Sequence, residues 1–164
     1  FKEALQKGIR SLEIKKFGLE SILFKDLKNV KADNGVLEKV YQKLRIPNAE
    51  RLFYIGDALR LGSDIEKIYE LTKIDRWFLH NIKEIIDLER AILENKNPIT
   101  REALSTAKEF GFSDRQLAAL LNKTEEEVYN LRKSLDVNPT FKLVDTCAAE
   151  FQAHTPYYYS TYES

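Results

Sequence analysis

Few side chains in this sequence have the types and spacing that catalysis or metal binding requires. Its single thiol is Cys147, and its two imidazoles are His80 and His154. A structural zinc site takes four nitrogen or sulfur ligands, so three candidates fall short of one. A Cys147–His154 nucleophilic pair is formally available, but a lone cysteine beside Ala148 and Ala149 is more typical of a small packed hydrophobe. We expect no metal site, and we place His80 at the surface of a helix.

Nucleotide chemistry has no recognisable motif here. The chain contains only six glycines, and none falls in the glycine-rich spacings that hold phosphate groups. Acidic residues lie mainly on segments that carry similar numbers of Lys and Arg, which is typical of solvated helix faces. The sequence therefore predicts no catalytic and no cofactor-binding residues within this chain.

Composition excludes several other classes of function. Hydrophobic residues make up 43% and charged residues 32% of the 164, a globular mixture with room for a hydrophobic core. The 26 basic and 26 acidic side chains cancel, which removes the usual electrostatic footprint of a nucleic-acid or membrane-surface partner. No apolar run approaches the roughly 20 residues that span a bilayer. With one cysteine, a reducing, cytoplasmic setting is expected. A start at Phe1 and the absence of Met favour a piece of a longer polypeptide.

Apolar residues recur every three or four positions over most of the chain, which is the spacing of one buried helix face. No part offers the several alternating strands of a self-contained sheet. Residues 19–33 fit neither period and predict an irregular crossing, and residues 139–164 predict an extended tail. The fold expected is all-α, an irregular orthogonal bundle of about seven helices with an extended C-terminal tail. The helical segments are 2–16, 33 or 34 to 45, 48–61, a short helix after 63, 76–95, 101–110, 114–122 and 125–135.

Helix starts are marked by capping signals. A capping box pairs a Ser or Thr with a Glu or Gln three residues later, each side chain bonding the other residue's backbone N–H. Asn48 and Asp75 are single-residue N-cap candidates, and Asp75 precedes the longest helix. The capping-box spacing occurs at Ser63 and Glu66, at Ser113 and Gln116, and at Thr124 and Glu127.

One segment, 112–135, has the layout of a helix-turn-helix DNA-binding motif. Such a motif places the start of its second helix against DNA. Here that start is Glu125–Glu127, three carboxylates that would repel phosphates but favour the helix dipole. A stand-alone helical interaction module or a helix-turn-helix nucleic-acid module therefore remains the alternative function. The tyrosines of 157–162 favour an apolar docking surface, because no basic residue follows Lys142 to bind a nucleic-acid backbone.

Five sequence motifs stand out in order along the chain. They are SLEI at 11–14, RLFYIGDALRLG at 51–62, LTKIDRWFLHNI at 71–82, VDTCAAEF at 144–151 and YYYSTYE at 157–163. Taken together, they resemble the middle of the carbamoyl phosphate synthetase large subunit. The motifs DRWF and DTCAAEF are far more specific than a capping signal, whereas residues 17–56 are matched mainly by helical layout.

The resemblance implies a non-catalytic helical connector, the oligomerisation domain, inside an ATP-dependent ligase of arginine and pyrimidine biosynthesis. It implies two flanking ATP-grasp halves that bind ATP with Mg or Mn, a small glutamine amidotransferase subunit that supplies ammonia, and homo-oligomers. It also implies a division of this chain. Residues 1–16 would be the last helix of the first half, 17–138 the helical connector, and 139–164 the crossing into the second half.

Interface candidates follow from that placement. Asp75 and Arg76 open the longest helix beside the sole tryptophan, Trp77, and a bidentate Arg pair next to an aromatic ring is a common way to fix an interface. Local roles remain open: Asp75 as a helix cap only, Arg76 as a solvated residue and Trp77 as part of the core.

Tunnel candidates are fewer. Glu13, on the first helix, would line a polar route if its carboxylate faces inward, but a solvated position two residues before Lys15 explains it equally well. Cys147 and Glu150, in the VDTCAAEF motif, complete the set of interface or tunnel candidates.

The missing phosphate loop generates a direct prediction. The 164-residue chain should neither bind Mg-ATP tightly nor hydrolyse it, because it has no backbone cradle for phosphates and no credible metal cluster. Isothermal titration calorimetry should show no saturable heat. A micromolar binding isotherm would contradict the placement of the ATP sites outside this chain.

Overall fold

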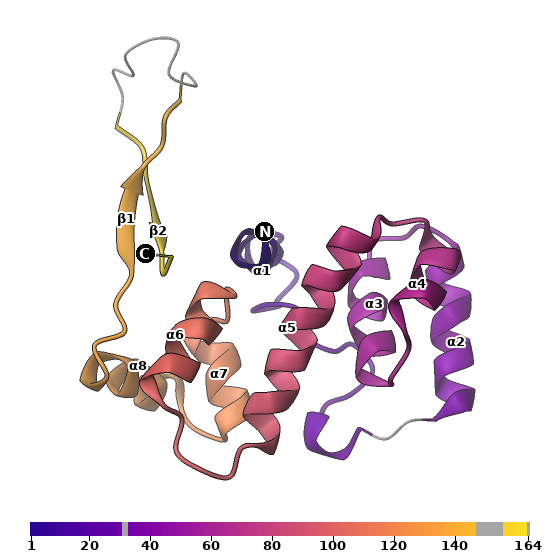
Figure 1. The fold of residues 1–164 in the computed structure, drawn as a ribbon, viewed down its shortest axis with the longest axis horizontal. Helices are drawn as coiled ribbons and strands as arrows, with labels where there is room; N and C mark the ends of the chain where they lie inside the picture. Colours follow the sequence, from indigo (N-terminus) through magenta and orange to yellow (C-terminus); the bar gives the residue numbers. More distant parts are fainter. Residues whose placement is uncertain (31–32, 147–155, 164) are drawn as a thin grey trace.

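The computed structural model describes residues 1–30, 33–146 and 156–163 (Figure 1). This part of the chain is mostly helical, with eight α-helices, one short 3₁₀ helix and one two-stranded sheet, which confirms the all-α prediction. The elements are α1 (Lys2–Ser11), η1 (Leu27–Asn29), α2 (Asn34–Arg45), α3 (Arg51–Arg60), α4 (Ile65–Thr72), α5 (Arg76–Glu94), α6 (Arg101–Glu109), α7 (Asp114–Leu121), α8 (Glu125–Ser134), β1 (Thr140–Leu143) and β2 (Tyr158–Thr161).

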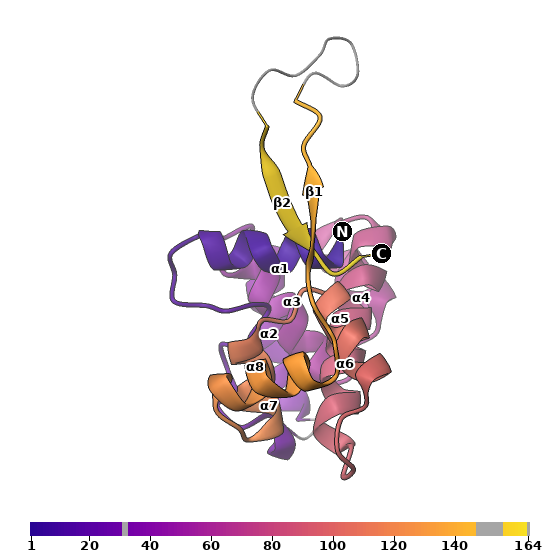
Figure 2. The same ribbon diagram turned by 90° about the vertical axis from the view of Figure 1, so that its left-hand side faces the viewer.

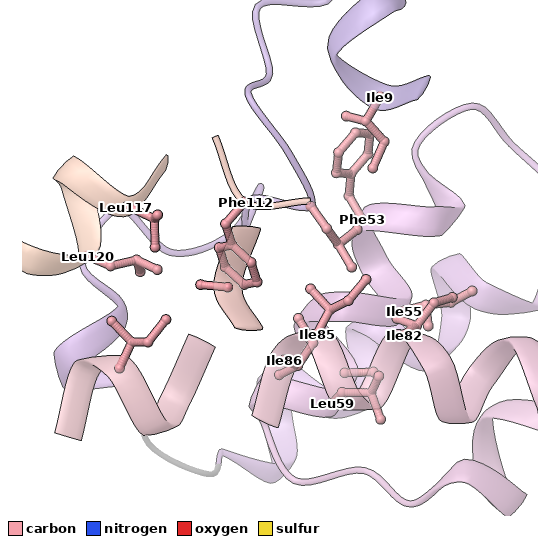
Figure 3. Packing of buried hydrophobic residues seen from close by; sticks show 14 of the residues in the cluster. Ile9, Phe53, Ile55, Leu59, Ile82, Ile85, Ile86, Phe112, Leu117 and Leu120 are labelled. Carbon is pink, nitrogen blue, oxygen red and sulfur yellow. The ribbon is translucent and has the colours of Figure 1, made fainter. Parts of the chain in front are cut away.

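The long helix α5 divides the bundle. Helices α2, α3 and α4 lie on one side of it, and α6, α7 and α8 on the other (Figure 1). Both groups bury apolar side chains against α5, where Leu79 and Ile85 are fully inaccessible. Figure 3 shows the ring of Phe53, from α3, next to Ile9 of α1, with Phe112, which precedes α7, in the same buried cluster as Ile85. The 19-residue amphipathic helix is therefore the centre of one continuous core.

Three predicted N-cap residues, Asp75, Ser113 and Thr124, accept a backbone N–H bond at the start of their helices. The Asp75 carboxylate accepts from the Trp77 backbone N–H at 2.8 Å and begins α5. Thr124 and Glu127 form the complete capping box of α8, with both side-chain bonds present.

Two other capping predictions are wrong: Ser63 does not cap α4, and Asn48 does not cap α3. Asp64, not Ser63, caps α4 by accepting from the Lys67 N–H at 2.7 Å, and the Ser63 hydroxyl pairs with that of Tyr41 at 2.9 Å. Helix α3 begins after Glu50, and Asn48 instead accepts from the Glu50 N–H within the preceding turn. At α4, a partner from helix α2 therefore decides which of two adjacent polar residues caps.

The first helix is shorter than its periodicity predicts. It ends at Ser11 instead of residue 16, because Glu13 and Lys15 both adopt left-handed backbone conformations with φ of 56° and 59°. The chain then crosses the bundle as an irregular segment, as predicted, interrupted only by η1. Residues 12–30 are called the crossing segment below.

Arg60 ties the crossing segment to two helices. Its guanidinium donates to the Leu19 carbonyl at 2.6 Å and to both oxygens of Glu89, at 2.7 and 2.8 Å. It also donates to Asp57 at 3.0 Å. The side chains of Arg60 and Glu89 are each only 4% exposed, so these charges are compensated by each other and not by water.

Asp57 extends the same cluster into the crossing segment. Its second carboxylate oxygen accepts from the backbone N–H groups of Ile22 and Leu23, at 3.1 and 3.2 Å. A segment without regular structure leaves such donors without helix or sheet partners, and buried donors need them. The name Arg60 clamp is used below for Arg60 with its three partners, which are Asp57, Glu89 and the Leu19 carbonyl, together with the N–H groups of residues 22–23 that bond Asp57.

The extended tail forms an antiparallel hairpin of β1 and β2. Thr140 pairs with Thr161 and Leu143 with Tyr158. The extended conformation was predicted, but the pairing was not, because neither strand has a distinct alternating pattern. Figure 2 shows the hairpin projecting from the helical body with its base beside α1.

Breaking the Arg60 clamp should lower the free energy of unfolding, so that the chain unfolds at a much lower urea concentration. Arg60→Met leaves Asp57 and Glu89 buried without their counter-charge, and losing one partner of a buried pair costs about 3–5 kcal/mol. Urea denaturation followed by circular dichroism measures this free energy of unfolding. Arg76→Met, which removes an exposed ion pair, is the matched control and should leave the midpoint nearly unchanged. Similar small shifts for both variants would contradict the role of the clamp.

Candidate functional site

Part of the predicted site lies beyond what the structure describes. Cys147, Glu150 and His154 fall outside the described residues. Within residues 1–30, 33–146 and 156–163, no three His, Cys, Asp or Glu side chains group as metal ligands would. His80 is exposed on α5, as predicted. Across the same ranges, no helix is long and apolar enough to cross a membrane.

Glu13 does not lie on a helix, contrary to the prediction. It follows the end of α1 in a left-handed conformation, and its side chain is exposed. The helical spacing of Leu5, Ile9 and Leu12 extends into this turn, and a periodic pattern alone does not mark where a helix stops.

Arg76 makes a two-pronged contact on the surface of α4 and α5. Its Nε and Nη2 donate to the two oxygens of Glu66, each at 2.7 Å, and its guanidinium lies 3.6 Å from the centre of the Tyr69 ring. The hydrogen bonds from Arg76 lower the pKa of Glu66. Arg76 is thus held in one orientation although it is exposed, which is a favourable state for contacting another surface.

Trp77 belongs to an exposed aromatic cluster and not to the core. Its ring is 55% exposed and packs edge-on against Phe1 at 5.2 Å and against Phe78 at 5.0 Å between ring centroids. The alternative that Trp77 is a core residue is therefore wrong for this chain. Trp, Phe and Arg side chains grouped on a surface have the composition of interface hot spots.

The first helix and the last strand are joined directly, although 158 residues separate the contacting side chains. The Thr161 hydroxyl donates to Glu3 at 2.7 Å, and Lys7 pairs with Glu3 at 2.8 Å and donates to the Ser160 carbonyl. Thr161 is only 2% exposed. Partial burial acts to raise the pKa of Glu3, but the hydrogen bonds from Lys7 and Thr161 outweigh it and bring the pKa below its ordinary value of 4.5.

Tyr162 continues this contact toward α6 and α8. Its ring lies 5.0 Å from the ammonium of Lys108 and 5.8 Å from the guanidinium of Arg132. Both cations are themselves held by Asp114, at 2.7 and 3.3 Å, and burial lowers the pKa of Lys108. The contact of Glu3 and Lys7 with Ser160, Thr161 and Tyr162 is called the terminal junction below.

The other side of α1 is fixed to the bundle. The buried Gln6 amide donates to the Phe110 carbonyl at 3.0 Å and accepts from the Leu19 N–H at 3.1 Å. Gly111 turns with φ of +88°, and a Cβ there would stand 2.8 Å from the Glu3 Cα. Only glycine allows the α6–α7 turn to approach α1 so closely.

Sequence reasoning missed both the terminal junction and the Arg60 clamp. The spacing of Glu3 and Lys7, four residues apart on a helix, is a signal for an ion pair but not for Thr161. Asp57 and Arg60 were another signal, because two opposite charges three residues apart lie within a strongly apolar helix. Neither pattern identifies a partner far away in the sequence.

The helix-turn-helix interpretation loses support from the geometry. Glu127 is engaged in the capping box of α8, so the acidic helix start has a structural cause. Arg132 is 6% exposed and bonded to Asp114 and the Val137 carbonyl. It is therefore not free to contact a phosphate.

Comparison with known proteins gives one consistent result. Residues 1–136 match the family model described as "Carbamoyl-phosphate synthetase large chain, oligomerisation domain". The chain is 47% identical over 168 residues to the carbamoyl phosphate synthase large chain of Archaeoglobus fulgidus, covering 99% of this chain and 15% of that one. It is 52% identical over 163 residues to the N-terminal section of the large chain of Aquifex aeolicus, with 99% and 28% covered. For the large chain of Thermoanaerobacter sp. (strain X514) the values are 47% over 162 residues, 99% and 14%.

The chain therefore belongs to the carbamoyl phosphate synthetase large-chain oligomerisation-domain family. It spans between about a seventh and just over a quarter of the length of these relatives. The resemblance recognised from its motifs is confirmed.

The terminal junction should make stability depend on acid pH. Because the pKa of folded Glu3 lies below its ordinary value of 4.5, the unfolded state binds the proton more readily. The stabilisation is complete above about pH 4.5 and is lost as pH falls through the folded pKa. The melting temperature should drop more between pH 7 and pH 3 for the wild type than for Glu3→Gln.

Glu38→Gln, at an exposed position on α2, is the control and should keep the wild-type pH dependence. An unchanged acid loss in Glu3→Gln would show that Glu3 contributes nothing to the fold through this contact.

Proposed function

We propose that this chain is the non-catalytic helical connector and assembly module of the carbamoyl phosphate synthetase large subunit. That enzyme would make carbamoyl phosphate from bicarbonate, glutamine-derived ammonia and two ATP. Two ATP-grasp halves of the same polypeptide would flank the chain and carry the ATP and its Mg or Mn. A small glutamine amidotransferase subunit would supply the ammonia, and the module would assemble into homo-oligomers.

The terminal junction carries the proposal. Helix α1 and strand β2 are joined by hydrogen bonds from Thr161 to Glu3 and from Lys7 to the Ser160 carbonyl, and the N and C labels lie close together in the view of Figure 2. Parts attached to the two ends would therefore leave from neighbouring points. The helical body would then lie to one side of the two attached parts and would not separate them. This arrangement suits a module that sets the relative position of two active halves.

The proposed division of the chain follows the same logic. Residues 1–16, of which 2–11 are helical, would complete the first half. Residues 17–138 would form the connector and 139–164 the crossing into the second half. The terminal junction then joins the first part, residues 1–16, directly to the third part, residues 139–164, so the two ends of the connector are held together.

Asp75, Arg76 and Trp77 would anchor the start of α5 against the flanking parts. Their support is the fixed Arg76 side chain and the exposed ring of Trp77. Glu13, Cys147 and Glu150 remain in the proposal as interface or tunnel candidates.

The proposal is tested by uncoupling the two halves in the full-length large chain. Thr161→Val removes the hydroxyl bonded to Glu3 with little change of shape. We expect it to lower carbamoyl phosphate formation by a larger factor than either partial ATP reaction, because the alignment of the halves suffers and not their chemistry. Thr106→Val, which removes a local bond to the Glu102 carbonyl within α6, is the matched control and should leave all three rates unchanged.

Arg76→Ala should show the same selective loss if the anchor operates. Equal losses in all three rates for both variants, or none, would contradict the connector function. In that case Thr161 and Arg76 serve only the stability of the chain.

A further inference from the structure

One face of the β1–β2 hairpin is apolar and uncovered. Directly opposed residues of an antiparallel pair point to the same face, and that face alternates along each strand. Leu143 lies opposite Tyr158, and Phe141 lies opposite Ser160. Phe141, Leu143 and Tyr158 therefore share one face, where they are 70%, 55% and 64% exposed. This set of three is called the hairpin face.

At its base, the opposite side of the hairpin packs against the helical body, whereas Tyr159 farther along that side is 48% exposed. Thr161 on that side is buried against Glu3, and Tyr162 follows at once beside Lys108 and Arg132. The hairpin is thus fixed at its base with a defined orientation. The hairpin face cannot turn inward without breaking the terminal junction.

The hairpin needs a further partner on physical grounds. Within the described residues, β1 and β2 form a sheet of two strands only, and two-stranded hairpins are marginal in water without packing. Unpaired strand edges also invite pairing with another strand. Large apolar side chains clustered on such an element mark an interaction surface. The hairpin face carries no charge, so the surface that covers it is expected to be apolar. The unpaired strand edges favour a partner that supplies a strand or a sheet.

We propose that the hairpin face is the docking surface for the part of the same polypeptide that follows residue 164. This inference rests on the proposed function, in which that part is the second ATP-grasp half. The matched segment makes up only 15% and 14% of the large chains of Archaeoglobus fulgidus and Thermoanaerobacter sp., so most of each of these relatives lies outside it. Strand β2 ends three residues before residue 164. A part tethered so close has an effective concentration on the order of millimolar, so it occupies the face ahead of any partner in solution.

Cysteine accessibility tests the occupant. The variant Leu143→Cys would be made in the full-length large chain and in the 164-residue chain. Peptide mass spectrometry would then measure how fast iodoacetamide alkylates Cys at position 143, and fragment ions would distinguish this site from Cys147. We expect alkylation in the full-length chain to be at least about tenfold slower, as for a site that reacts only after a local opening. Phe141→Cys should show the same protection. Ile46→Cys, at a 70% exposed position between α2 and α3, is the control and should react equally in both chains.

Equal rates at 143 and 141 in the two chains would overturn the inference. Protection that appears in the 164-residue chain as its concentration rises would overturn it too, since the occupant would then be a second copy. These outcomes can be distinguished from a failure of the proposed function. Selective uncoupling by Thr161→Val together with an accessible hairpin face would retain the connector and remove only its docking surface.

Discussion

A crossing segment without regular structure must satisfy its buried backbone groups, and Arg60 is the residue that allows it. One guanidinium bonds the Leu19 carbonyl, Asp57 and Glu89, while Asp57 receives the N–H groups of Ile22 and Leu23. Buried charges are tolerated only when paired in this way. The clamp fastens residues 12–30 to α3 and α5, and through this segment it fixes where α1 enters the bundle.

The position of α1 in turn determines the position of the hairpin. Gln6 and Gly111 seat α1 against the crossing segment and the α6–α7 turn. Glu3 then presents its carboxylate to Thr161. The chain is therefore closed on itself by three successive polar contacts, and none of them requires a ligand. This arrangement supports the proposed connector function, because the contacts bring α1 and β2 together, and the family to which the chain belongs is described as an oligomerisation domain.

The parts of the fold that depend on local chemistry were predictable. Apolar spacing and the caps at Asp75 and Thr124 located the long central helix and the last helix to within a residue or so. Contacts distant in sequence were not predictable. The hydroxyl of Ser63 is hydrogen-bonded to that of Tyr41, so Asp64 caps α4 in its place. The hairpin pairing depends on a base held by α1. Within the candidate site, the motif around Trp77 was found by resemblance, whereas its exposure is decided by packing alone.

The central claim is that α1 and the hairpin form one rigid unit at the base of the helical body. To test this claim, spin labels are attached at Gly8→Cys, where a side chain meets open space, and at Phe141→Cys, with Cys147 replaced by Ala. Pulsed electron paramagnetic resonance then measures the distance between the two labels. The account predicts a single narrow distance distribution that broadens when Thr161→Val is added. A broad distribution before that substitution would contradict it.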